Sequence, residues 1–291
     1  MSIDILQDKI RKTKNPSVLD LSIAVSELPP HLLAEEGSAS GAYKRFCAEM
    51  LTALKGVVPA VRVGFAPFAL LGTDGLTVMS EVLKSAREQG YYVVLEAPEL
   101  WSPAMAKATA DAVFAEEATY PCDGLIINAY PGSDMIKPFL PYCKKGKDIF
   151  CVVRTSNKSA PEIQDLLSGT RLVHMAAADI INRFGSDNTG KSGYARVAIM
   201  AGANSAESLK SLRMKYPRLF VLLDAMDYPN CNAKICSHAF DKFGHGAAAC
   251  VGSSVLHAWK QTESDGIDYI VHAQAAAERM KKNLTRYITI L

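Results

Sequence analysis

Residues 195–223 read ARVAIMAGANSAESLKSLRMKYPRLFVLL, and this stretch contains the unit from which the fold is predicted. An apolar run at 195–201 precedes Ser205, a residue type that caps helices, and an amphipathic segment that stops before Pro217. A second apolar run follows at 219–223. We interpret the stretch as a strand, a helix and a second strand.

The same alternation of apolar runs and helix-like segments extends over nearly the whole chain. The runs are almost continuously apolar, which is typical of strands buried on both faces of a parallel sheet. Thr73 with Asp74, and Ser159 with Glu162, mark further helix starts. The sequence predicts eight strands, at residues 18–23, 60–66, 91–96, 124–128, 149–154, 195–201, 219–223 and 247–251.

Eight such units without a Pro-, Gly- or Ser-rich linker favour one α/β domain, a single (β/α)8 TIM barrel over residues 1–291. We expect it to carry a short N-terminal amphipathic helix and a C-terminal helix. The alternative is an open, doubly wound sheet. That fold would need a Gly-rich turn after the first strand, and residues 24–30 read AVSELPP.

The composition excludes several classes of partner. The chain has 32 Lys and Arg against 30 Asp and Glu, a net charge of +2, so it offers no electrostatic surface for nucleic acid. No apolar run is long enough to span a membrane, and no signal-peptide core is visible at the N-terminus. The 7 cysteines are scattered. We expect a cytoplasmic protein that binds neither nucleic acid nor membrane and has no disulfide framework.

In a barrel of this type, binding and catalytic side chains come from the C-terminal ends of the strands. These ends form a ring that is polar but carries few charges. Its members are Ser22, Arg62, Glu96, Asn128, residues 155–157, residues 202–204, residues 224–227 and residues 252–254.

Two of these strand ends carry a family resemblance. Residues 128–139 read NAYPGSDMIKPF and residues 152–160 read VVRTSNKSA. With these segments the chain resembles the orotidine 5′-phosphate decarboxylase family in its longer bacterial form. Weaker similarity extends in order over roughly residues 15–260. The resemblance implies a barrel of that family, a link to pyrimidine metabolism, and a homodimer.

The segment after the third strand departs from the family. There the family carries Asp-x-Lys-x-x-Asp-x-x-x-Thr, whose Lys protonates the carbanion left by loss of CO₂. The matching positions here are Glu96, Pro98, Trp101 and Met105. Only the first acid is kept, as Glu96, and a proline has no proton to give. The resemblance therefore assigns no catalytic residue with confidence.

The positions that bind the substrate in the family also differ. Ser22 replaces an Asp that contacts the ribose, and Arg62 replaces a Lys. Val255 stands where the family has a phosphate-binding Arg. Asp224 and Asp227 lie where the family has a Gly-rich phosphate loop, and two acids there would repel a phosphate. We predict that the protein does not decarboxylate orotidine 5′-phosphate.

The leading hypothesis is a catalytically deficient homologue that binds a small molecule at the barrel mouth, or a protein, in a non-catalytic role. The candidate ligand-binding residues are Ser22, Arg62, Asn128, Thr155, Ser156 and Asn157. The last three have a structural alternative, because such residues also cap helices and close loops, and a helix is predicted to start near Pro161.

An alternative from the enzyme class uses the acids Glu96, Asp224 and Asp227 on a different, non-phosphorylated substrate, as a lyase or related barrel enzyme. Its structural counterpart is an ion pair between Arg62 and Glu96 across neighbouring strands. A third hypothesis keeps the decarboxylase, with an unrecognised proton donor such as Lys107.

Three further expectations concern the surroundings of the site. Trp101 and Tyr228 can stack on a ligand or fill the vacated pocket, and we expect them to fill it. The apolar residues at 100–105 suit the interface of a homodimer. Cys231, Cys236 and His238 have the spacing C-x4-C-x-H, which is not a standard zinc pattern, so we expect no metal and no cofactor.

Overall fold

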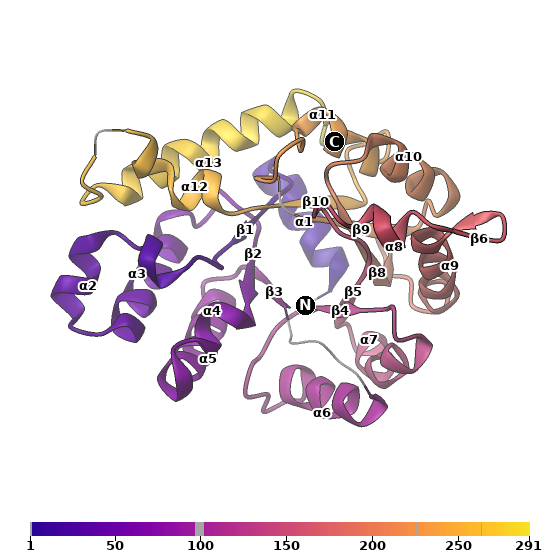
Figure 1. Cartoon of the computed structure of the whole chain (residues 1–291), viewed down its shortest axis with the longest axis horizontal. Helices are drawn as coiled ribbons and strands as arrows, with labels where there is room; N and C mark the ends of the chain where they lie inside the picture. Colours follow the sequence, from indigo (N-terminus) through magenta and orange to yellow (C-terminus); the bar gives the residue numbers. More distant parts are fainter. Residues whose placement is uncertain (1, 97–101, 225, 263) are drawn as a thin grey trace.

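Eight parallel strands close into a barrel in the order β1-β2-β3-β4-β5-β8-β9-β10, with β10 paired to β1 (Figure 1). The computed structural model describes residues 2–96, 102–224, 226–262 and 264–291. The prediction of a closed α/β barrel is confirmed. The strands are β1 (Ser17–Asp20), β2 (Ala60–Gly64), β3 (Tyr92–Glu96), β4 (Gly124–Asn128), β5 (Asp148–Arg154), β8 (Ala195–Gly202), β9 (Leu219–Asp224) and β10 (Ala247–Val251).

Helices cover the outside of this barrel (Figure 1). In the described part of the chain, no helix is both long enough and apolar enough to cross a membrane. The longer helices are α1 (Ile3–Thr13), α2 (Pro30–Glu36), α3 (Ala39–Ala53), α5 (Gly72–Glu88), α6 (Pro103–Phe114), α9 (Val173–Ser186), α10 (Ala206–Lys215) and α13 (Tyr269–Thr285). The short ones are α4 (Phe65–Ala69), α7 (Leu140–Lys144), α8 (Pro161–Gln164), α11 (Ala233–Cys236) and α12 (Ser253–Leu256).

The first two strands end earlier than the sequence predicts. β1 stops at Asp20, because its carboxylate Oδ1 accepts a hydrogen bond from the backbone N–H of Ser22 at 3.0 Å and turns the chain. β2 stops at Gly64, and Phe65 begins α4. The side chain of Asp20 therefore lies at the end of the first strand.

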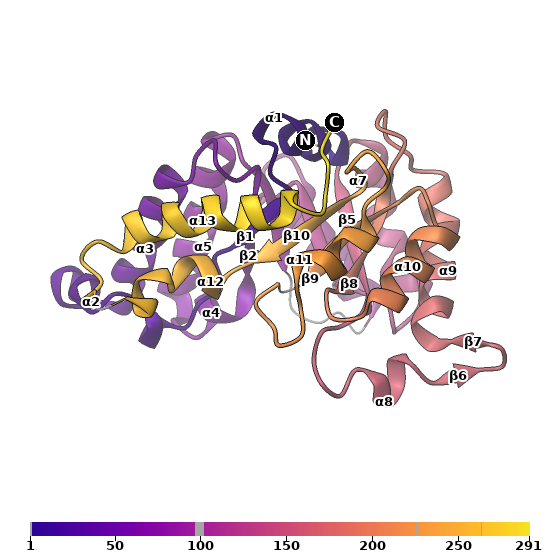
Figure 2. The same cartoon turned by 90° about the horizontal axis from the view of Figure 1, so that it is seen from above.

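A hairpin replaces most of the helix that was predicted after Ser159. α8 contains four residues, and the chain then forms two short antiparallel strands, β6 (Leu167–Ser168) and β7 (Arg171–Leu172), before α9 begins. Gly169, at the tip, has a φ of +66°, which an L side chain rarely adopts. Figure 2 shows that α8 and this hairpin project at the opposite end of the barrel from α1.

Helix α1 packs across the end of the barrel where the strands begin. Its side chains Ile3, Leu6 and Ile10 are fully buried. Gln7, on the same helix, accepts a hydrogen bond from the backbone N–H of Gly246 at 3.0 Å, directly before β10. The open mouth is therefore at the other end, where the strands finish.

The backbone at Gly246, directly before β10, packs closely against the ring of Tyr194, and a mutation can test this contact. It has a φ of +80°, and a Cβ there would lie 2.4 Å from the ring of Tyr194, whereas Gly193, with a φ of +85°, has nothing within 4 Å. Both Gly→Ala variants incur the left-handed backbone cost of about 1–2 kcal/mol. Gly246→Ala should lose about 1–3 kcal/mol more from overpacking. Urea unfolding monitored by circular dichroism measures both, and equal losses would contradict the packing described.

Candidate functional site

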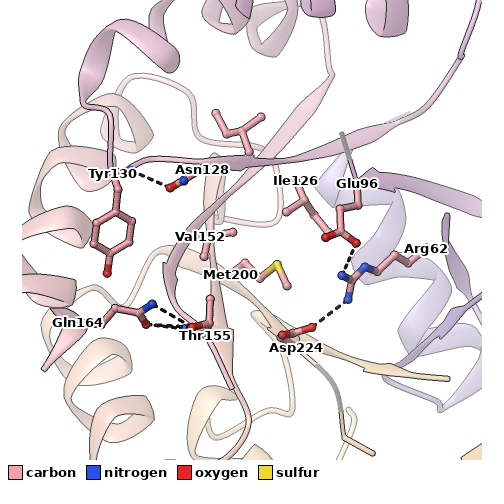
Figure 3. Close-up of a pocket in the computed structure, with 11 residues that line it drawn as sticks. Arg62, Glu96, Ile126, Asn128, Tyr130, Val152, Thr155, Gln164, Met200 and Asp224 are labelled. Carbon is pink, nitrogen blue, oxygen red and sulfur yellow. Dashed lines mark hydrogen bonds and ion pairs between the residues drawn. The ribbon is translucent and has the colours of Figure 1, made fainter. Parts of the chain in front are cut away.

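A pocket of about 240 Å³ lies at the mouth, over the ends of β2 to β5, β8 and β9 (Figure 3). We call it the first pocket. Ile126, Val152 and Met200 give it an apolar centre, and the polar side chains stand on two sides of it (Figure 3). Its polar lining is Arg62, Glu96, Asn128, Tyr130, Thr155, Gln164 and Asp224.

On one side, the guanidinium of Arg62 joins the ends of four strands. Its Nη2 lies 2.5 Å from Oε2 of Glu96, and its Nη1 lies 2.9 Å from Oδ1 of Asp224 and 3.4 Å from Oδ2 of Asp20. We call these four residues the Arg62 cluster. Its formal charge is −2, from one cation and three carboxylates. The predicted pair between Arg62 and Glu96 is confirmed, and two further acids join it.

Burial governs the electrostatics of the Arg62 cluster. The Arg62 side chain is 9% exposed. Loss of water lowers the pKa of Arg62, but the charge of Asp20, followed by the other nearby groups, outweighs it, so the pKa stays well above its ordinary value. Burial raises the pKa of Asp20 despite the opposing charge of Arg62. The guanidinium is therefore a permanent cation whose charge is already matched within the protein.

The other side of the first pocket consists of uncharged polar groups. Asn128 Oδ1 accepts from the backbone N–H of Tyr130 at 3.0 Å, and the hydroxyl of Tyr130 donates to the carbonyl of Val153 at 2.6 Å. Gln164 Oε1 accepts from the backbone N–H of Thr155 at 2.8 Å, and its Nε2 donates to Thr155 Oγ1 at 2.9 Å. Amides and hydroxyls of this kind suit a flat, uncharged ligand that carries its own donors and acceptors.

The run Thr155, Ser156 and Asn157 divides in the structure. Thr155 lines the first pocket, whereas the buried Ser156 donates its hydroxyl to the carbonyl of Asp224 at 3.3 Å, and Asn157 is exposed. The structural alternative holds in part. No side chain caps α8, whose N-cap is Ala160, but hydrogen bonds of Thr155 with Asn157 and Gln164 close the loop. Of the three predicted residues, only Thr155 lines the first pocket.

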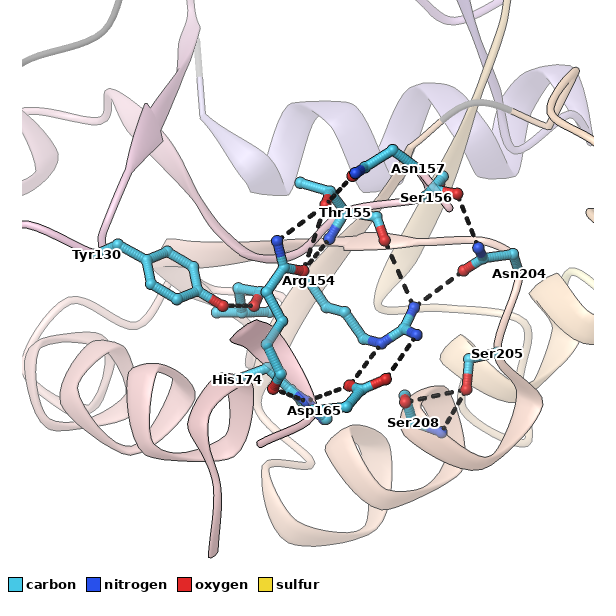
Figure 4. A network of polar contacts seen from close by, with 12 residues as sticks. Tyr130, Arg154, Thr155, Ser156, Asn157, Asp165, His174, Asn204, Ser205 and Ser208 are labelled. Carbon is cyan, nitrogen blue, oxygen red and sulfur yellow. Dashed lines mark hydrogen bonds and ion pairs between the residues drawn. The ribbon is translucent and has the colours of Figure 1, made fainter. Parts of the chain in front are cut away.

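A network of hydrogen bonds and ion pairs behind Thr155 and Gln164 holds the uncharged side of the first pocket in place (Figure 4). Arg154, at the end of β5, donates from Nε and Nη2 to the two carboxylate oxygens of Asp165, each at 3.0 Å, and from Nη1 to Asn204 Oδ1 at 3.0 Å. His174 Nδ1 lies 3.1 Å from Asp165 Oδ1. The hydrogen bonds from Arg154 lower the pKa of Asp165 below its ordinary value. The network fixes the segment that carries Gln164.

A second pocket, of about 360 Å³, lies beside the first over β1 and β10, and Asp20, Ser22, Asp227 and Tyr228 are among its lining residues. Ser22 belongs here and not to the first pocket, and its Oγ accepts from the backbone N–H of Gly64 at 2.8 Å. Four of the six predicted ligand-binding residues therefore line two neighbouring pockets, Arg62, Asn128 and Thr155 the first and Ser22 the second, whereas Ser156 and Asn157 line neither.

The carboxylate of Asp227 accepts hydrogen bonds from the loop after β10. Its Oδ2 accepts from the backbone N–H of Gly252 at 2.5 Å, and its Oδ1 accepts from that of Ser254 at 3.3 Å. The three acids of the alternative enzyme hypothesis thus do not form one group. Glu96 and Asp224 meet at Arg62, whereas Asp227 has its own partners.

The remaining candidates lie away from the first pocket or outside the described residues. The expectation that Tyr228 fills the vacated site is wrong, because its side chain is 48% exposed and lines the second pocket. Met105, on α6, is 44% exposed. Lys107 pairs with Asp111 on the exposed face of α6 and lines neither pocket. Pro98 and Trp101 lie outside the described residues.

Sequence reasoning missed Asp20, Tyr130 and Gln164. The signal for Asp20 was available, since an acid in an apolar run marks a strand end, but the run appeared to continue to residue 23. Tyr130 lies two residues beyond the strand end at Asn128. Gln164 is nine residues from Thr155, and no local pattern connects the two.

The Arg62 cluster leads to a prediction about stability and pH. Replacing Arg62 by Met leaves three carboxylates without their cation, so we expect a loss of about 3–5 kcal/mol at neutral pH. Without the cation, the carboxyl pKa values in the folded protein should rise above those in the unfolded chain. The folded state then binds more protons, so the deficit should shrink as the pH falls through about 5 to 4.

Arg45→Met is the matched control. Arg45 also contacts three carboxylates, those of Glu35, Glu36 and Glu49, but its side chain is 34% exposed. Water screens such pairs, so the control should lose much less stability. Urea unfolding of both variants and of the unaltered chain at pH 7 and pH 4 measures the difference. A deficit for Arg62→Met that does not depend on pH would refute the proposed electrostatic origin.

The chain is similar in sequence to curated proteins of one kind. The chain is 28% identical over 290 residues to an orotidine 5′-phosphate decarboxylase of Clostridium perfringens (strain 13), and the alignment covers 99% of each protein. It is 26% identical over 268 residues to an orotidine 5′-phosphate decarboxylase of Rhodopirellula baltica, covering 89% of each. No protein-family model matches the chain.

Solved structures show the same barrel. Leishmania donovani OMP decarboxylase has a TM-score of 0.75 and 20% identity, covering 99% of this chain and 98% of that one. Plasmodium berghei orotidine 5′-monophosphate decarboxylase has a TM-score of 0.78 and 15% identity, covering 98% of each chain. The chain is thus similar over most or all of its length to curated orotidine 5′-phosphate decarboxylases, and solved structures of such enzymes have the same barrel fold.

Proposed function

We propose that the chain is a divergent orotidine 5′-phosphate decarboxylase homologue that does not decarboxylate orotidine 5′-phosphate and that binds a small, uncharged or cationic ligand at its mouth. The observation that carries the proposal is the position of Asp227. Its carboxylate binds the backbone N–H groups of Gly252 and Ser254, in the loop where the family resemblance places a phosphate-binding Arg. A negative charge in that place opposes a phosphate.

The charge of the mouth supports the same conclusion. Arg62 is the one cation among the described residues that line the two pockets, and the carboxylates of Asp20, Glu96 and Asp224 already surround it. A substrate that carries both a phosphate and a carboxylate would meet more acid than base there. Enzymes usually gain most of their rate from charges and dipoles already aimed at the reacting atoms, and the field at this mouth has the wrong sign for such a substrate.

The proton donor of the family also has no counterpart that the described residues supply. Pro98 matches the position of the catalytic Lys in the sequence. Lys107 lies on the outer face of α6, paired with Asp111. Glu96 and Asp224 are both bound to Arg62, which weighs against either acting as a free general base. These points favour binding over the alternative enzyme hypotheses.

The first test is direct. We expect the purified protein to convert orotidine 5′-phosphate no faster than buffer does, because it lacks the Lys and the phosphate contacts. Loss of substrate absorbance measures this, with the Clostridium perfringens relative assayed in parallel as the control. Turnover above the buffer rate that disappears in Lys107→Gln would instead support the retained decarboxylase.

A second test separates the base side of the mouth from the phosphate side. Thermal-shift titrations should show that uridine stabilises the protein at least as strongly as uridine 5′-phosphate does, with shifts that grow with concentration. Asp227→Asn should strengthen binding of the 5′-phosphate by about fivefold or more, because repulsion between unit charges about 4 Å apart is worth about 1 kcal/mol even in bulk water. Uridine binding should not change.

Asp8→Asn is the control for this experiment, because Asp8 lies on α1 at the opposite end of the barrel. It removes the same charge and should leave both ligands unaffected. Tighter binding of uridine 5′-phosphate than of uridine by the unaltered protein would mean that a phosphate site persists. No shift with either ligand would remove the pyrimidine class while leaving the predicted loss of catalysis in place.

A further inference from the structure

Helix α13 packs against α12 and Ala258–Gln261 on the outside of the barrel, and a groove of about 490 Å³ lies between them. We call it the basic groove. Arg279, Lys282 and Arg286 line it from α13 and its end, and no described lining residue is acidic. The other lining residues are the uncharged polar Ser254, Gln261 and Asn283 and the apolar Ala276 and Met280.

The charges of the basic groove are unmatched. Within the described ranges, none of Arg279, Lys282 and Arg286 forms an ion pair, and the buried hydroxyl of Ser254 has no hydrogen-bond partner. Glu278 is the one carboxylate of α13, and it does not line the groove. Arg45, by contrast, contacts three carboxylates. Like charges spaced three and four residues apart on a helix repel one another, so an anion would relieve this face.

The helix dipole explains only part of this arrangement. Cations near the C-terminus of a helix are favourable, but the effect fades within the last turn. This accounts for Lys282 and Arg286, near the end of α13 at Thr285. Arg279 lies more than one turn before that end, and it nevertheless faces the same groove. The helix dipole therefore does not account for Arg279, whose side chain is exposed on this face.

We propose that the basic groove binds a small anion of the phosphate class with more than one negative charge, separately from the ligand at the mouth. Guanidinium groups bind phosphate oxygens with paired, charge-assisted hydrogen bonds, and Gln261 and Asn283 supply neutral donors beside them. The volume lies within the range of about 300–1,000 Å³ that small-molecule sites occupy.

Calorimetric titration with inorganic pyrophosphate at constant ionic strength tests the proposal. We expect saturable binding by the full chain. Arg279→Gln combined with Arg286→Gln should weaken it by about tenfold or more, because charge-assisted hydrogen bonds are lost. The matched control is Lys84→Gln combined with Lys158→Gln, which removes two exposed charges elsewhere and should bind as the unaltered chain does.

Several outcomes would overturn the proposal. They are the absence of saturable binding at millimolar pyrophosphate, equal binding by the groove variant, and an equal loss in the control, which would indicate general attraction to a positive protein. Binding to vesicles containing phosphatidylglycerol without binding to pyrophosphate would assign the groove to a membrane surface instead. If the double variant unfolds, Lys282→Gln alone gives the same comparison.

Discussion

The guanidinium of Arg62 is the contact on which the mouth of this barrel depends. It is nearly excluded from water, and it holds carboxylates from the ends of β1, β3 and β9. A cation in this position fixes the ends of three strands relative to one another, which uncharged contacts of the same length would do less strongly. The same three carboxylates neutralise the positive charge that would otherwise attract an anionic ligand. Structural order at the mouth and the proposed rejection of such a ligand therefore have one cause.

Much of the barrel could be predicted from the sequence, because strands buried on both faces leave continuous apolar runs. The errors occurred where a local hydrogen bond overrides such a run. Asp20 ends β1 by accepting from the N–H of Ser22, although the apolar pattern continues to Ile23. The hairpin of β6 and β7 was missed because each strand contains two residues, too few to show a period.

The site was predictable to a smaller extent. The pair of Arg62 and Glu96 followed from the neighbouring positions of two strands in a parallel barrel, and Asn128 and Thr155 followed from strand ends. The role of Gln164 depends on a chain reversal that is stabilised by contacts of Arg154 with Asp165 and of His174 with the carbonyl of Gln164. No repeating sequence pattern connects these residues, so the reversal could not be predicted. The exposed fraction of Tyr228 likewise depends on its loop and not on its residue type.

The bonds between Gln164 and Thr155 have a thermodynamic consequence for any occupant of the first pocket. Because these groups already satisfy one another, a ligand must exchange hydrogen bonds with them and gains little net enthalpy by doing so. The apolar surfaces of Ile126, Val152 and Met200 must then supply most of the affinity. Binding of a ligand should therefore be accompanied by a negative change in heat capacity. Because Thr155 and Gln164 are already held in place before binding, little conformational entropy is lost when the ligand binds.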